Sequence, residues 1–304
     1  MNLGVLFAYL CYAGFSVGDA LLKALGSTSM STFEISFFAA LFSGVAMLFL
    51  KPRGESWRDV FLVRHPAILL VRSLSGFFAS VLGVVSLITI PFAETYALIF
   101  MAPFLVTLMS ALFLRERIGW VGVMALVVGF AGVVVAVRPG FRALELGHIT
   151  AAAAAFFVAI STILVRRIAA SERQTSLLML PQLVTGIASA LVMSTHYVSP
   201  TPLELGLILV SGAFGAVAQL LLILAARRVG AASIGQAQFS QLIWAVVLGA
   251  LFFAEPPDVW SLAGIVLIIA AGLLRLRDRT RLPEVDAGLT VGRTETPPPS
   301  LPST

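Results

Sequence analysis

The sequence predicts an all-α membrane protein with ten transmembrane helices, arranged as two five-helix repeats of opposite orientation. Long apolar runs fill nearly all of the 304 residues, 59% of the residues are hydrophobic and 12% are charged, and the mean hydropathy is +1.00. A helix rises about 1.5 Å per residue, so about 20 apolar residues cross a hydrocarbon layer about 30 Å thick. This composition excludes an ordinary soluble domain.

Ten of the apolar runs have the length of a membrane span. They are continuous rather than alternating, which favours helices over the strands of a β-barrel. The expected spans are Val5–Lys23, Phe33–Leu50, Ala67–Ile90, Phe92–Leu114, Gly119–Val137, His148–Val165, Ser176–Ser194, Leu203–Ala225, Ala231–Phe253 and Val259–Leu274.

The basic residues lie mainly in the connections on one side of these spans. The positive-inside rule places that side, and with it both termini, in the cytoplasm. The same rule accounts for the net charge of +5, so we expect a lipid bilayer around the chain and no nucleic-acid partner. No signal peptide precedes the first span, which we expect to be retained.

A short segment near the end of the fourth span recurs near the end of the ninth. The two segments are Ala111–Glu116 and Ala250–Glu255, which are 139 residues apart (250 − 111), and with one added residue Trp120 and Trp260 are 140 apart (260 − 120). Because each repeat crosses the membrane five times, the second repeat enters from the opposite side. Such inverted repeats suit alternating access, with a binding site near the midplane at their junction. The expected divisions are residues 1–140, residues 141–278, and a disordered cytoplasmic tail at 279–304 rich in Pro, Ser and Thr.

The clearest signature lies in the fourth and fifth spans and comprises Pro91–Leu98, Pro103, Leu114–Gly119, Gly129–Val133 and Arg138–Gly140. It resembles the drug/metabolite transporter superfamily, in particular the ten-span proteins with two EamA domains. The resemblance covers essentially all the spans and implies a secondary transporter for a small molecule, without a cofactor, in a bacterial inner membrane.

Within that superfamily, Gly18–Lys23 and Phe33–Phe38 are similar to riboflavin importers and also to S-adenosylmethionine carriers of intracellular bacteria. Members of the second group often have Arg after the paired Phe, where this chain has Ala39 and Ala40, which counts against a cationic or zwitterionic substrate read at that point. Riboflavin uptake is the best single hypothesis. An exporter of amino acids or other metabolites, a membrane-embedded enzyme and a homodimeric assembly stay open as alternatives.

Charged residues inside the spans need an explanation, because a charge at the bilayer centre costs about 2.5 to 3.5 kcal/mol. Asp19 and Lys23 are one helical turn apart and are expected to pair, either as a structural ion pair with Lys23 reaching outward or with Asp19 as a substrate or proton site. Glu34 fits a capping box with Ser31. Glu94 lies in the first turn of its helix, where it caps the helix or carries a proton.

Other ionisable groups lie closer to the span ends. Arg72 lies near the cytoplasmic end of the third span, so its side chain can reach the membrane surface. The alternative interpretation is that Arg72 has a gating or ligand-binding role. Glu116 and Glu255 end equivalent spans and are interpreted as interfacial anchors. His65, His148 and His196 stand alone near span ends, Cys11 is the single cysteine, and no motif for catalysis, nucleotides or metals occurs, so we expect no metal site.

Neutral polar and aromatic residues complete the candidate site. Amides can both donate and accept hydrogen bonds, Gln238 and Gln241 are expected to share a helix face, and Pro103 and Pro181 mark kinks that suit cavity walls. The residues expected to contact substrate are Asp19, Lys23, Arg72, Tyr96, Phe100, Thr107, Gln182, Gln238, Gln241 and Trp244; those expected to carry a coupling proton are Asp19 and Glu94.

Overall fold

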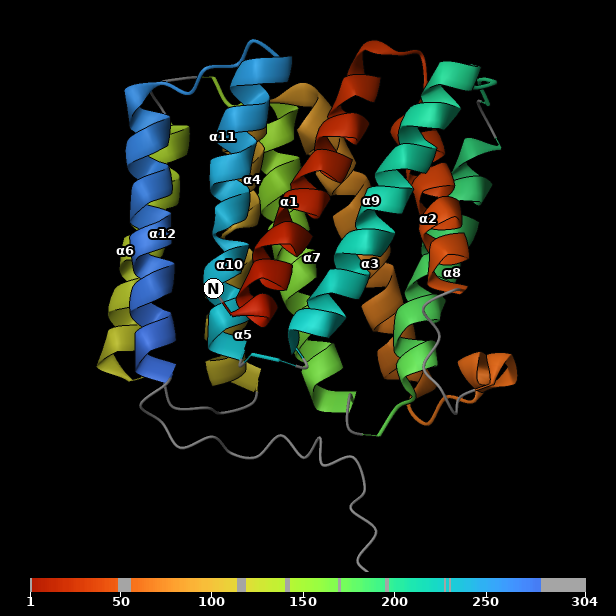
Figure 1. Cartoon of the computed structure of the whole chain (residues 1–304), viewed down its shortest axis with the longest axis horizontal. Coiled ribbons are helices and arrows are strands. Elements are labelled where there is room, and N and C mark those ends of the chain that lie inside the picture. The colour runs from red at the N-terminus through yellow and green to blue at the C-terminus, as the bar shows by residue number, and fades with distance from the viewer. Residues whose placement is uncertain are drawn as a thin grey trace, which may run out of the picture.

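The computed structural model of the chain describes residues 2–48, 56–113, 119–139, 143–168, 171–194, 197–226, 228–229 and 231–279. Glu116 and the tail predicted beyond residue 279 lie outside them. The elements in the described residues are all helices (Figure 1): α1 Leu3–Ala24, η1 Leu25–Ser27, α2 Thr32–Leu48, η2 Trp57–Phe61, α3 Pro66–Thr89, α4 Phe92–Ile99, α5 Ala102–Phe113, α6 Trp120–Val137, α7 Leu146–Ile168, α8 Gln174–Met193, α9 Pro202–Ala226, α10 Ala231–Gln238, α11 Ser240–Phe252 and α12 Val259–Arg279.

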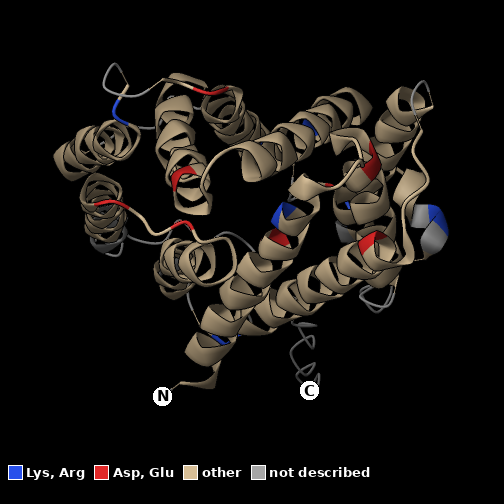
Figure 2. Ribbon diagram, turned by 90° about the horizontal axis from the view of Figure 1, so that it is seen from above, with Lys and Arg blue, Asp and Glu red and all other residues tan. Residues whose placement is uncertain are grey.

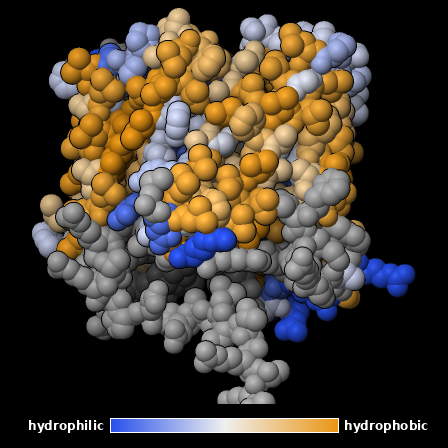
Figure 3. Space-filling model, viewed as in Figure 1, coloured by the Kyte–Doolittle hydropathy of each residue, from blue (hydrophilic) through white to orange (hydrophobic). Residues whose placement is uncertain are grey.

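Eight segments of the described residues are long and apolar enough to cross a membrane. Two of them are the combined stretches of α4 with α5 and of α10 with α11. Two further apolar helices, Thr32–Leu48 and Val259–Leu274, are shorter. The outer surface is correspondingly apolar, with large side chains such as Val127 and Ile187 more than half exposed, and Figure 3 shows a broad hydrophobic band across the visible face. The chain is therefore a multi-pass membrane protein.

Helices from the two halves of the chain interlock rather than form separate lobes. Helix α1 packs along α9, and α7 packs along α3; α2 contacts both α8 and α9, and α8 contacts both α2 and α3. Helix α6 pairs with α12, and α1 begins and α12 ends in the lower half of the bundle in Figure 1. Helices whose numbers differ by six are equivalent in the two halves. The contact of α1 with α9 then corresponds to that of α7 with α3, and the contact of α2 with α9 corresponds to that of α8 with α3.

Two predicted spans are interrupted. The fourth is broken at Phe100 and Met101 because Pro103, in the first turn of α5, has no N–H for the carbonyl of Ile99. The ninth is broken at Phe239, at the equivalent position and without a proline. The rings of Phe100 and Phe239 lie 5.5 Å apart at their centroids, so the two interruptions meet in the largest apolar core cluster.

Close helix crossings depend on small residues. An ideal Cβ on Gly132 of α6 would lie 2.9 Å from the carbonyl oxygen of Gly264 on α12, and a Cβ on Gly264 would come still closer to the Gly132 oxygen. In α1, Gly14 faces Ala218 and Gly18 faces Ser211 on α9. The backbones of these helix pairs approach each other because no side chain separates them.

Candidate functional site

Most of the ribbon carries no charge (Figure 2), and two groups of polar side chains inside the bundle join the two halves of the chain. The first, here named the α1–α4 cluster, consists of Asp19, Lys23, Glu94, Tyr96, His148 and Glu255. The second is a cavity of about 300 Å³, here named the α2–α8 cavity, lined by Ala39, Ala40, Ser43, Gly76, Ser80, Pro181, Gln182 and Thr185.

Asp19 and Tyr96 form the centre of the α1–α4 cluster. The Tyr96 hydroxyl donates a hydrogen bond of 2.6 Å to Oδ2 of Asp19, and Tyr96 is buried. The ring of Tyr96 stacks at 6.4 Å on Phe100. The carboxylate of Asp19 is thus held between α1 and α4.

The predicted Asp19–Lys23 ion pair is wrong. Lys23 is 8% exposed, and its ammonium donates to the carbonyls of Leu87 at 2.9 Å and Ile90 at 2.8 Å. Its ion-pair partner is Glu255, at 3.0 Å. The outward-reaching Lys23 is wrong for the same reason: the carbonyls at the end of α3 provide acceptors inside the protein, so the side chain has no need of the membrane surface.

Glu255 is not the surface anchor that the sequence predicts. One of its oxygens pairs with Lys23, and the other accepts a hydrogen bond of 2.9 Å from the N–H of Phe92, at the start of α4. Its side chain is 26% exposed. Lys23 and Glu255 together join the ends of α1 and α3, the start of α4 and the segment after α11. We name this pair the Lys23–Glu255 link.

Glu94 pairs with His148, which the sequence analysis treats as isolated. Oε2 of Glu94 lies 3.0 Å from Nε2 of His148, and both side chains are buried. Nδ1 of His148 accepts a hydrogen bond of 3.1 Å from the N–H of Glu145. With Nδ1 as acceptor, the ring proton is on Nε2 and is donated to Glu94. This pair connects α4 to α7.

Glu34 confirms the predicted capping box. The N–H of Ser31 donates to Glu34 at 2.6 Å, and the N–H of Glu34 donates to the Ser31 hydroxyl at 3.2 Å. The other oxygen of Glu34 accepts from the N–H of Val198 at 2.5 Å. The charge therefore satisfies backbone donors on both halves of the chain.

The α2–α8 cavity lies where α2, α3 and α8 meet. Nε2 of Gln182 lies 3.4 Å from Oγ of Ser43, and the hydroxyls of Ser80 and Thr185 belong to the same lining. Pro181 lies inside α8, as expected for a cavity wall. All these polar groups are neutral and can both donate and accept hydrogen bonds.

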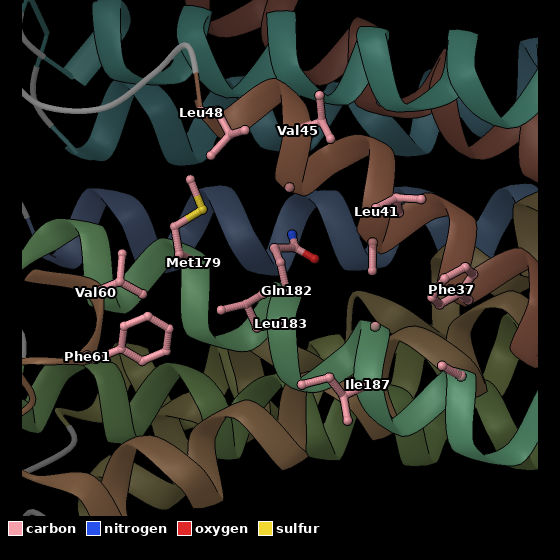
Figure 4. A pocket seen from close by; sticks show the side chains of 14 residues that line it. Phe37, Leu41, Val45, Leu48, Val60, Phe61, Met179, Gln182, Leu183 and Ile187 are labelled. Atoms are coloured by element: carbon pink, nitrogen blue, oxygen red, sulfur yellow. The ribbon is translucent and has the colours of Figure 1, made fainter. Parts of the chain in front are cut away.

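A larger, apolar cavity of about 580 Å³ adjoins the first and shares Ala40 and Gln182 with it. It is open to the apolar outer surface, where its lining residues Leu41 and Ile187 are exposed. Figure 4 shows the Gln182 amide among the side chains of Leu41, Leu183 and Met179, between α2 and α8. Gln182 is the polar group common to both cavities. Together they offer hydrogen-bonding groups on one side and an apolar surface on the other.

Arg72 lies on α3 and contacts α8. Its Nη1 donates a hydrogen bond of 2.8 Å to the carbonyl of Leu177. Pro181, four residues after Leu177, has no N–H to give to that carbonyl. Arg72 thus replaces the hydrogen bond that the proline removes from α8.

The remaining candidate residues are not gathered with these groups. Thr107 is buried and donates to the carbonyl of Pro103 at 2.8 Å, so its hydroxyl serves α5 itself. Gln238 ends α10 and Gln241 lies in α11; the uninterrupted helix that was expected to carry both is wrong. Trp244 is 38% exposed beside Ile243, which is 59% exposed.

Sequence reasoning missed the partners rather than the charged residues. Glu255, His148, Ser43 and Thr185 lie far along the chain from Lys23, Glu94 and Gln182, and no local spacing joins them. The repeated segment that ends in Glu255 is the one signal that singles out this residue. Among the described residues, no group of three His, Cys, Asp or Glu side chains is placed to hold a metal ion.

Known transporters are similar in sequence over most of the chain. An S-adenosylmethionine uptake transporter from Rickettsia bellii is 26% identical over 273 residues, covering 90% of this chain and 92% of that protein. A pseudopaline exporter from Pseudomonas aeruginosa is 30% identical over 271 residues, covering 88% and 94%. A riboflavin transporter from Rhizobium johnstonii is 30% identical over 246 residues, covering 80% and 79%.

A solved crystal structure shares the fold, with a TM-score of 0.65 at 20% identity over 92% of this chain and 99% of that one. The EamA-like transporter family matches two stretches, residues 2–138 and residues 145–276. These stretches contain both groups of polar residues described above. The chain belongs to the EamA-like transporter family.

Proposed function

We propose that this protein is a ten-helix secondary transporter that moves a small organic metabolite across a bacterial inner membrane by alternating access. Its two five-helix repeats occupy residues 1–140 and 141–278 with opposite orientations, and both termini are cytoplasmic. The observation that carries the proposal is the equivalence of helix contacts: α1 on α9 corresponds to α7 on α3, and α2 on α9 to α8 on α3. Two equivalent halves can exchange conformations, and an inverted repeat needs this equivalence.

The substrate site in this proposal is the α2–α8 cavity. Helices α2 and α8 are equivalent in the two repeats, so the cavity lies at the repeat junction. Its volume of about 300 Å³, with about 580 Å³ adjoining it, is in the range of cavities for small molecules. Gln182, Ser43 and Thr185 supply the polar contacts, and the apolar surface receives a flat ring system.

The Lys23–Glu255 link and the Glu94–His148 pair lie away from the α2–α8 cavity, at the end of the bundle where α1 ends and α4 begins. Each pair joins the first repeat to the second, and in this proposal the two pairs hold that end closed. In an alternating-access cycle, one end of the substrate pathway is closed while the other is open, and the two ends then exchange states. We propose that this end is the periplasmic one and that both pairs separate when it opens.

The substrate is proposed by similarity and by the cavity. Riboflavin and S-adenosylmethionine both combine a flat heteroaromatic ring with polar groups, which suits the mixed lining. Export is the second candidate, favoured by the 30% identity to the pseudopaline exporter over 88% of this chain. The membrane-embedded enzyme has no comparable support.

Transport is tested with purified protein in liposomes and in cells. Radiolabelled riboflavin and S-adenosylmethionine are supplied outside vesicles that contain the same unlabelled compound, and we expect counterflow of one of them. A riboflavin auxotroph expressing the protein then separates uptake from export, because only an importer rescues growth on low vitamin. Folded protein that gives no counterflow with any metabolite of a vitamin, nucleoside and amino-acid panel would contradict the transporter proposal.

Replacing Gln182 with Ala is expected to weaken substrate binding about threefold to tenfold, the value of one or two neutral hydrogen bonds. Binding is measured by isothermal titration or scintillation proximity with the compound that gives counterflow. Leu183→Ala is the matched control, because Leu183 lines only the apolar cavity. Equal losses in both variants would argue against a polar contact at Gln182.

Replacing Asp19 with Asn tests the proton-coupling role. Asn still accepts the hydrogen bond from Tyr96 but has no titratable charge. If Asp19 carries the proton, uptake driven by a pH gradient falls to the level of vesicles without a gradient, while counterflow exchange continues. Tyr96→Phe, which leaves the carboxylate in place, is expected to keep the gradient response. An unchanged gradient response in Asp19→Asn would remove Asp19 from the coupling path.

A further inference from the structure

Arg72 lies on the same face of α3 as the wall of the α2–α8 cavity. Gly76 and Ser80 line the cavity, and Arg72 precedes them by one and two helical turns. Residues four apart along a helix share a face. The guanidinium therefore lies beyond the end of the cavity, toward the start of α3.

The contact of Arg72 with α8, the helix across the cavity from α3, also places the guanidinium just beyond the end of the cavity. Arg72 donates to the carbonyl of Leu177 at 2.8 Å, and Leu177 is one turn before Pro181, which lines the cavity together with Gln182. The hydrogen bond holds the Arg72 side chain across the gap between α3 and α8. The Arg72 side chain thus closes the end of the α2–α8 cavity between α3 and α8.

This cation has no anion of its own in the part of the chain that the structure describes. The ion pairs there join Lys23 to Glu255 and Arg138 to Asp258, the carboxylate of Glu94 is bound by His148, and the cavity lining contains no carboxylate. Of the five N–H groups of the guanidinium, Leu177 takes one, and the buried Nε has no hydrogen-bond partner. An arginine stays charged in such surroundings, so an unpaired one in a membrane is costly.

We propose that Arg72 is the anion subsite of the α2–α8 cavity and that the transported metabolite carries a carboxylate. The inference rests on the proposed transport function and narrows its substrate class. The carboxylate accepts from the free edge of the guanidinium, and the neutral part of the substrate lies against Gln182, Ser43 and Thr185. S-adenosylmethionine has such a carboxylate and riboflavin has none, so the subsite selects compounds of the first kind.

The test compares matched pairs of compounds on the full-length protein in phosphatidylcholine vesicles. The pairs are S-adenosylmethionine with its carboxyl methyl ester, and riboflavin 5′-phosphate with riboflavin; in each pair, the second compound lacks the anionic group of the first. We expect wild-type protein to bind and transport the compound with the anionic group about 10- to 100-fold better in at least one pair, as a hydrogen-bonded charge pair provides.

The variants assign that preference to Arg72. Arg72→Gln is expected to bind both members of the pair equally, while Arg72→Lys retains part of the preference because it retains the charge. Arg72→Gln also loses reach toward Leu177, so the comparison uses the ratio within each pair, and the lysine variant serves if the glutamine variant does not fold. A ratio near one in wild type, or a preference that persists in Arg72→Gln, overturns the anion subsite but leaves transport intact.

A lipid phosphate has the same anionic chemistry as a substrate carboxylate. The measurements are therefore repeated with phosphatidylglycerol in the vesicles. Preference for the anionic compound is expected to survive. If phosphatidylglycerol abolishes the preference and raises the melting temperature of wild type but not of Arg72→Gln, the subsite belongs to a lipid and the substrate assignment is wrong. Folded wild type that transports no member of either pair counts against the proposed transport function itself.

Discussion

Replacing Lys23 with Met is expected to lower the free energy of unfolding by about 3 to 5 kcal/mol, as for other buried ion pairs that lose one partner. The ammonium is bound by Glu255 and by the carbonyls of Leu87 and Ile90. Without it, the carboxylate of Glu255 has no cation and two carbonyls at the end of α3 lose a donor. Thermal unfolding in detergent micelles measures the loss.

Arg138→Met is the matched control, because it removes a cation from an ion pair that is more exposed. The side chains of Arg138 and Asp258 are 22% and 43% exposed, and pairs near the surface contribute at most about 1 kcal/mol. We therefore expect a clearly smaller effect. A Lys23→Met loss no greater than that of Arg138→Met would contradict the structural importance of the Lys23–Glu255 link.

The double variant Lys23→Met with Glu255→Leu separates pairing from simple damage. It removes both charges, and apolar replacement of a buried pair is often neutral or stabilising, so most of the lost stability is expected to return. The exchange of the two charges should not restore it, because a glutamate at position 23 would face the carbonyls of Leu87 and Ile90. Transport by the folded double variant then reports what the link does in the cycle.

Replacing Gly264 with Ala is expected to destabilise the protein by about 1 to 3 kcal/mol, the usual cost of overpacking. Its Cβ would lie against the carbonyl oxygen and the next turn of α6 at Gly132 and Ala136, closer than real Cβ contacts. Backbone cannot rotate away as a side chain can, so α6 and α12 must separate. The melting temperature and the fraction of monodisperse protein measure the effect.

Gly215→Ala is the control for this substitution. Gly215 lies in α9 and has nothing within 4 Å of an added Cβ, so alanine is expected to leave stability unchanged or raise it by less than about 1 kcal/mol. Equal melting temperatures for the Gly264 and Gly215 variants would contradict a close crossing of α6 and α12.

The sequence predicts the helices well and their partners poorly, for physical reasons. Apolar length determines where a membrane helix lies, and the capping box at Ser31 and Glu34 is local, so both can be found from spacing. Lys23 shows the limit of this reasoning. Asp19, one turn away, is the nearest carboxylate along the helix, but Glu255 comes closer through the packing of α11 against α1.

In the candidate site, too, local features can be predicted from the sequence and contacts between distant residues cannot. Gln182 and Pro181 are recognisable from sequence as a polar residue and a helix breaker within an apolar run. That Arg72 bonds to Leu177 could not be foreseen, because it requires knowing that α3 and α8 are neighbours. The interruption at Phe239 was equally hidden, since no proline or glycine marks it; it is visible only as the counterpart of the break at Phe100.

The two interrupted spans contact each other at Phe100 and Phe239, so we expect their helices to tilt about this contact. Main-chain hydrogen bonding is already incomplete on both sides of this ring pair, so tilting α4 against α5, or α10 against α11, sacrifices few further bonds. Because the ring centroids lie 5.5 Å apart, we expect a bend between α4 and α5 to displace the junction of α10 and α11 as well. The two interrupted spans would then change their tilt together.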